Sequence, residues 1–120
     1  NSANGGISIL LGNGNGTFQS QKTYTTGRDP SFIAVDDFNR DHKIDLAISN
    51  YGEDDVTILL GDGHGNFRLS GKYTTGASPM SVISGHFNDD NNSDLVVATS
   101  ENFNVMILLG KGDGTFPKPT

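Results

Sequence analysis

The segment from Asp37 to Asp45 places oxygen-bearing side chains at alternate positions. Asp37, Asn39 and Asp41 occupy positions 1, 3 and 5, and Asp45 occupies position 9. A tightly curled loop with this spacing can direct several oxygens to one centre, and the backbone carbonyl of Lys43, at position 7, adds another. Three carboxylates, one amide oxygen and one carbonyl supply most of the roughly six to eight oxygens that Ca²⁺ takes in proteins. The spacing therefore predicts a calcium site at Asp37, Asn39, Asp41, Lys43 and Asp45.

The ligand types favour a hard cation. The chain has no Cys, and the one His in the loop, His42, stands at position 6, where no ligand is expected. Mg²⁺ keeps its waters and is bound by few carboxylates, so Ca²⁺ is the predicted ion. An EF-hand is excluded because Ile48 stands where that motif needs Glu. The alternative is a solvated acidic hairpin whose Asp and Asn residues serve turn formation only.

A second segment with similar spacing follows 49 residues later. Asn88, Asp90, Asn92 and Asp94 form a weaker candidate metal site, with Asn88, Asp90 and Asp94 at positions 3, 5 and 9. Position 1 is His86, and an imidazole is a poor ligand for Ca²⁺. Weak calcium binding and a loop that folds without metal are both open at this second segment.

These two loops belong to an internal repeat. The segment Ile9–Phe18 recurs as Ile58–Phe67 and as Ile107–Phe116, and residues 7–55 match residues 56–104 at 17 of 49 positions without a gap. Within one period, β-forming runs at residues 31–35, 46–49, 56–60 and 67–75 predict four strands and no helix. A Gly-rich hairpin joins the last two of these predicted strands. Four strands every 40 to 50 residues are typical of a β-propeller blade, whereas a β-sandwich would not repeat its turns at a fixed period.

The repeat frame makes residues 1–120 part of one all-β propeller domain. Residues 7–26 are predicted to form the last two strands of one blade, residues 30–76 a complete blade and residues 79–120 a nearly complete blade. Propellers close with about four to eight blades, so about 2.4 repeats indicate a fragment of a larger propeller or an oligomer that closes the ring. Phenylalanines recur at two repeat positions and are predicted to pack between blades: Phe18, Phe67 and Phe116 at one, Phe38 and Phe87 at the other.

Composition excludes several classes of function. The net charge is −6 and the pI about 4.7, and the 8 basic residues are scattered. A nucleic-acid partner is therefore not expected. No apolar run approaches the roughly 18 residues of a membrane span.

Asp36 and Asp37 are neighbours in an extended segment and point to opposite faces, so they form no acid–base pair. We predict no catalytic residues and no enzymatic activity.

The stretch from Ser31 to Ala47, followed by Val56 to Phe67, resembles an FG-GAP repeat of the VCBS type. It is similar to the repeats of the integrin α-subunit N-terminal β-propeller, and the resemblance covers essentially the whole chain. It implies calcium in the Asp-x-Asn-x-Asp-x-x-x-Asp loop and an extracellular or cell-surface location. Position 6 of the loop, often Gly in this family, is His42 here.

The expected function is a calcium-binding extracellular module for cell adhesion or for protein or carbohydrate recognition. The alternatives are the propeller scaffold of a secreted enzyme and a structural spacer in a large secreted protein. The expected partners are a protein or carbohydrate ligand and the remaining blades, in the same chain or in an oligomer. The ligand-binding residues stay unknown, because such residues lie on loops of several blades.

Overall fold

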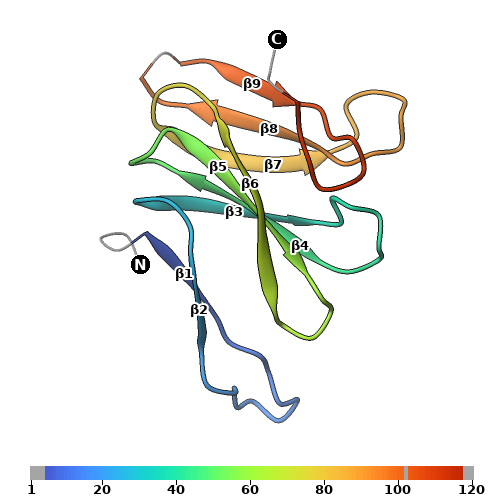
Figure 1. Cartoon of the computed structure of the whole chain (residues 1–120). Coiled ribbons are helices and arrows are strands. Elements are labelled where there is room, and N and C mark those ends of the chain that lie inside the picture. The colour runs from blue at the N-terminus through green and yellow to red at the C-terminus, as the bar shows by residue number, and fades with distance from the viewer. Residues whose placement is uncertain (1–4, 102, 118–120) are drawn as a thin grey trace.

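A computed structural model describes residues 5–101 and 103–117. The described residues form strands, turns and loops, with no helix, and hence none long and apolar enough to cross a membrane. Figure 1 labels the strands, which are β1 (Gly6–Ile9), β2 (Lys22–Thr25), β3 (Pro30–Asp36), β4 (Asp45–Asn50), β5 (Asp55–Gly61), β6 (Phe67–Thr74), β7 (Pro79–Gly85), β8 (Asp94–Thr99) and β9 (Val105–Leu108). The predicted all-β class is confirmed. The ends of the predicted domain, residues 1–4 and 118–120, lie outside the described residues.

The strands form three antiparallel sheets, in the orders β1-β2, β3-β4-β5-β6 and β7-β8-β9. The four strands predicted over residues 31–75 are therefore confirmed as one sheet. The second and third sheets also share a register at an offset of 49 residues. Pro30 pairs with Asn50 in the second sheet, and Pro79 pairs with Thr99 in the third. The first strand of each of these sheets, β3 or β7, also has a register shift just after its proline.

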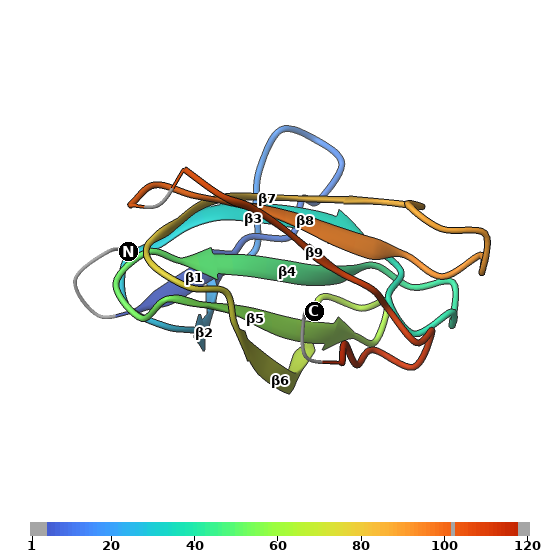
Figure 2. The same cartoon turned by 90° about the horizontal axis from the view of Figure 1, so that it is seen from above.

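The second and third sheets pack face to face, with β3 next to β7 (Figures 1 and 2). Side chains alternate between the faces of a strand. One face of the second sheet therefore carries Val56 and Ile58 toward the third sheet, where Leu108 meets them. All three are fully buried. The whole buried cluster is Ala34, Phe38, Ala47, Val56, Ile58, Leu60, Val82, Leu95, Val97, Leu108 and Phe116.

The opposite face of the second sheet packs on the β1–β2 hairpin. Ile7 from β1 contributes to a buried cluster with Ile48 and Leu59. Tyr24 and Phe67 complete this contact edge to face, with ring centroids 5.6 Å apart. The second sheet is thus covered on both faces, which explains why β4 is buried along its whole length.

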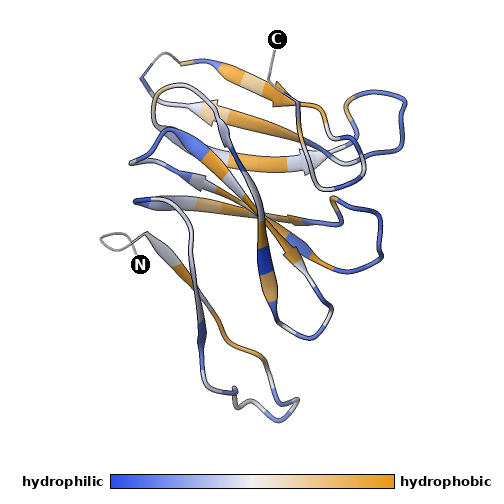
Figure 3. Cartoon of the chain, viewed as in Figure 1, coloured by the Kyte–Doolittle hydropathy of each residue, from blue (hydrophilic) through white to orange (hydrophobic). Residues whose placement is uncertain are grey.

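The third sheet leaves one apolar face uncovered. Its outward face, defined by Ile83, Val105, Ile107 and Leu109, is 42 to 67 % exposed. Figure 3 shows the hydrophobic colouring of β9, which carries part of this face. At an offset of 49 residues, Val56 and Ile58 occupy the same positions in the second sheet and are buried. Residues at these positions are therefore buried only where a neighbouring sheet covers them.

The recurring phenylalanines are only partly packed between sheets. Phe38 and Phe116 are buried and meet edge to face, with centroids 5.7 Å apart. Phe18 and Phe87 are 63 % and 46 % exposed. The prediction of inter-sheet packing is therefore wrong for these two, because no described sheet covers the hairpin of Phe18 or the outward side of Phe87. Phe67 is partly buried against Tyr24.

Candidate metal centre

The predicted metal loop joins β3 to β4. The antiparallel pair Asp36–Asp45 closes the hairpin, so the residues between them must turn sharply. Arg40 and His42 have φ values of 60° and 64°. This is the left-handed region that glycine enters most easily. His42 therefore adopts, at some conformational cost, the backbone that a glycine at position 6 would adopt freely.

Carboxylates of the loop accept its own backbone amides. The Asp41 N–H donates to Asp37 Oδ1 at 3.1 Å, and the His42 N–H donates to Asp37 Oδ2 at 2.7 Å. The Lys43 N–H donates to Asp41 Oδ1 at 2.9 Å. These bonds are typical of turn-forming Asp residues. They order the loop and hold its carboxylates in place.

Asp45 is fully buried at the start of β4. Its Oδ2 accepts the Phe38 N–H at 2.8 Å, and its Oδ1 accepts the Gly61 N–H at 2.8 Å. A Cβ at position 61 would lie 2.1 Å from the Ile44 carbonyl oxygen, so only glycine allows this approach. The sequence predicts only a turn-forming role for the hairpin glycines, and this close approach at Gly61 is an additional role that the structure shows. A glycine recurs directly after each Ile-Leu-Leu run, and this recurrence is the sequence feature that could have indicated the role.

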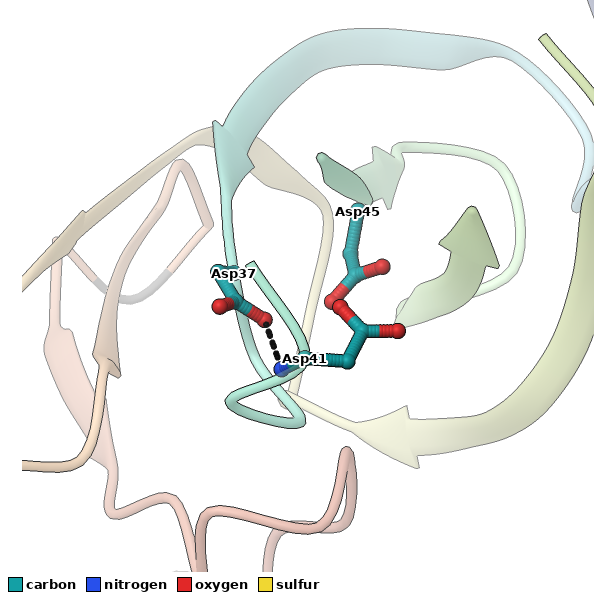
Figure 4. Close-up of side chains that lie close together, drawn as sticks. All are labelled: Asp37, Asp41 and Asp45. Atoms are coloured by element: carbon teal, nitrogen blue, oxygen red, sulfur yellow. Dashed lines mark hydrogen bonds between the residues drawn. The ribbon is translucent and has the colours of Figure 1, made fainter. Parts of the chain in front are cut away.

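The three carboxylates come together in space. One carboxylate oxygen each from Asp37, Asp41 and Asp45 lies within 4.8 Å of the others. Figure 4 shows the carboxylates of Asp41 and Asp45 turned toward each other, with Asp37 bonded to the Asp41 amide. The structure thus brings together three of the five predicted ligand residues. It is the single such acidic group within residues 5–101 and 103–117.

Asn39 contributes an unsatisfied oxygen beside this group. Its Nδ2 donates to Asp41 Oδ2 at 3.2 Å, whereas its Oδ1 is buried without a hydrogen-bond partner. A buried acceptor without a partner costs about 1–3 kcal/mol. For Asn39 to bind a cation together with Asp41, its amide must turn so that Oδ1 takes the place that Nδ2 has in this structure, and this would satisfy the oxygen. The position-7 ligand, the Lys43 carbonyl, stays a prediction from the spacing.

Burial and neighbouring charges oppose the ionisation of Asp45, whereas hydrogen bonds favour the ionised form of Asp41. Burial raises the pKa of Asp45, and the charges of Asp41 and Asp37 act in the same direction. Desolvation also acts to raise the pKa of Asp41, but hydrogen bonds from Lys43 and Asn39 hold it below its usual value. Since the folded pKa of Asp45 is raised, its contribution to stability is present at acidic pH and lost as pH rises through that pKa. A bound cation would favour the ionised form and remove this penalty.

The second loop keeps the framework of the first without its acidic group. Asp94 is fully buried, and it accepts the Phe87 N–H at 3.0 Å and the Gly110 N–H at 2.8 Å. The Asn92 N–H donates to Asp90 Oδ1 at 3.1 Å. Asn88 is exposed, and position 1 carries an imidazole in place of a carboxylate. The weaker candidate site thus keeps Asp90 and Asp94 as its acidic residues at ligand positions.

The Gly-rich hairpin after β5 carries a separate acidic cap. Asp62 accepts hydrogen bonds from the backbone N–H groups of His64 and Asn66 and from the Asn66 side chain. The bond from the Asn66 side chain is the largest influence, and together the three lower the pKa of Asp62 to about 2. Asp62 is therefore a structural residue of the turn.

Comparisons with known proteins identify no relative, since no protein-family model, curated protein or solved structure matches this chain.

Proposed function

We propose that this chain is a calcium-binding β-propeller module of an extracellular or cell-surface protein, which serves adhesion or the recognition of a protein or carbohydrate. The observation that carries the proposal is the acidic group of Asp37, Asp41 and Asp45, with the unpartnered Asn39 oxygen beside it. Carboxylate and amide oxygens are the ligands that Ca²⁺ prefers. The resemblance to FG-GAP repeats points to the same ion.

The arrangement of the sheets supports a propeller. Consecutive sheets pack face to face with a shared register. Their loops recur at the same end of the molecule, where residues 37–44 and residues 86–93 both lie (Figures 1 and 2). The outward face of the third sheet would be covered by a further blade. In this proposal, other blades of the same protein or of an oligomer complete the ring.

Calcium in this proposal has a structural role. The loop joins the edge strand β3 to β4, and an ion would neutralise carboxylates that otherwise repel one another. If the ion binds the folded chain and not the unfolded chain, its binding free energy adds to the free energy of unfolding. The carboxylates accept backbone amides of the loop and of the adjacent hairpin. These bonds suit a structural centre, and we assign the module no catalytic activity.

Calorimetric titration of the chain with CaCl₂ tests the proposal, with MgCl₂ as the competing ion. We expect one site per chain, with a dissociation constant in the roughly 10⁻⁴ to 10⁻³ M range of extracellular modules. Asp41→Ala should abolish this site. The matched variant Asp90→Ala, at the same position of the second loop, should leave it unchanged. Absence of calcium binding by the folded wild-type chain would refute the proposal.

A further inference from the structure

Position 1 makes opposite kinds of hydrogen bond in the two loops. In the first loop, Asp37 is an acceptor, and it takes the N–H groups of Asp41 and His42. In the second loop, His86 replaces it, and its Nδ1 lies 3.0 Å from the backbone carbonyl oxygen of Asn92. A carbonyl oxygen can only accept, so the imidazole must donate through Nδ1–H.

The carbonyl that His86 contacts is the one at position 7. Asn92 corresponds to Lys43, whose carbonyl is the predicted backbone ligand of the first loop. The imidazole N–H therefore takes one of the two lone pairs of the oxygen that would be the position-7 ligand of an ion. The rest of the loop matches its counterpart: Asp94 takes its two backbone amides, and Asn91 has a left-handed φ of 61° like that of His42.

We infer that His86 closes the loop of residues 86–94 without metal, and that the residue at position 1 decides which loop binds calcium. The inference rests on the proposed function for its statement about the first loop. In the first loop three carboxylates converge, and under the proposed function a cation balances their charge. The second has one carboxylate fewer at its ligand positions and has a side-chain donor on its position-7 carbonyl. Its hydrogen bonds hold the turn in the metal-free state.

The variant His86→Asp tests the specificity part of this inference. It removes the imidazole from the Asn92 carbonyl and restores the carboxylate of position 1. We expect calorimetric titration to count two calcium ions per chain instead of one. His64→Asp is the matched control, because it makes the same chemical change in an exposed hairpin and should still bind one. A folded His86→Asp chain that binds no additional calcium would overturn the inference.

A measurement on the wild-type chain tests the metal-free closure separately. With chelator present and at alkaline pH, where imidazoles are neutral, ¹⁵N NMR should find His86 as the Nδ1–H tautomer. The Nε2–H tautomer at His86 would overturn the inference whether or not the first loop binds calcium. Conversely, absence of calcium binding by the wild-type chain, with the Nδ1–H tautomer present, would refute the proposed function and leave the histidine closure standing.

Stability gives a second comparison of the two loops. His86→Ala should lower the melting temperature by the same amount in calcium and in chelator, because the bond it removes involves no ion. Asp37→Ala should lower it more in calcium than in chelator. A calcium-dependent loss for His86→Ala would overturn the inference, since it would place an ion in the second loop.

Discussion

Phe38 and Phe87 occupy the same position of the two loops, yet the structure predicts very different costs for removing them. Phe38 is 2 % exposed and lies edge to face with Phe116 from the neighbouring sheet. Phe87 is 46 % exposed and belongs to the uncovered side of the third sheet. Phe38→Ala and Phe87→Ala therefore make the same chemical change in a covered and an open site.

The expected magnitudes follow from this burial. Truncating a buried Phe to Ala costs about 3–5 kcal/mol, because the lost transfer free energy is joined by the cost of the cavity. The aromatic pair with Phe116 accounts for about 0.5–1.5 kcal/mol of that loss. Full burial of a Phe is worth about 1.5–3 kcal/mol, so removing the half-covered Phe87 should cost about 1 kcal/mol and leave no closed cavity. The two variants should differ by about 2 kcal/mol or more, which is roughly a 30-fold difference in the unfolding equilibrium constant.

Urea unfolding followed by circular dichroism measures this difference. The chain has no Trp, so a fluorescence change from that residue is not available as a probe. Saturating calcium in both samples keeps the state of the loop constant. At dilutions where sedimentation shows a monomer, equal losses for Phe87→Ala and Phe38→Ala would refute the reasoning, since no second chain would then cover Phe87.

Three further perturbations test the loop, the hairpin and the open face. Calcium chelation should speed amide exchange across Asp37–Leu46 more than in β6, because the unneutralised carboxylates repel one another. Hydrogen-exchange mass spectrometry measures this, and equal acceleration along the whole chain would contradict it. Asp62→Ala should lower the melting temperature above pH 3.8, the usual pKa, and the difference should vanish as pH falls toward the folded pKa of about 2; a difference that persists at lower pH would contradict the assignment. Ile107→Lys, on the outward face of the third sheet, should reduce self-association of the chain in sedimentation, whereas Thr23→Lys, at an exposed polar position, should not. Equal effects of the two variants would show that the chains do not associate through this outward face.

Several features of this protein follow from sequence alone because they are local. The 49-residue repeat, the β-forming runs and the turn residues place β3 to β6 within one or two residues of their observed bounds. The alternate spacing of Asp37, Asn39 and Asp41 likewise identifies the loop as a metal candidate. Neighbouring residues and the two-residue period of a strand determine these features.

Burial and hydrogen-bond partners were decided by tertiary structure. Asp45 is held by the amide of Gly61, sixteen positions away, and that approach depends on how the hairpin after β5 folds back on the loop. Phe38 and Phe87 have the same repeat position and opposite exposure, because a neighbouring sheet covers only one of them. Identical local sequence signals thus lead to different environments wherever the covering residues come from another part of the chain.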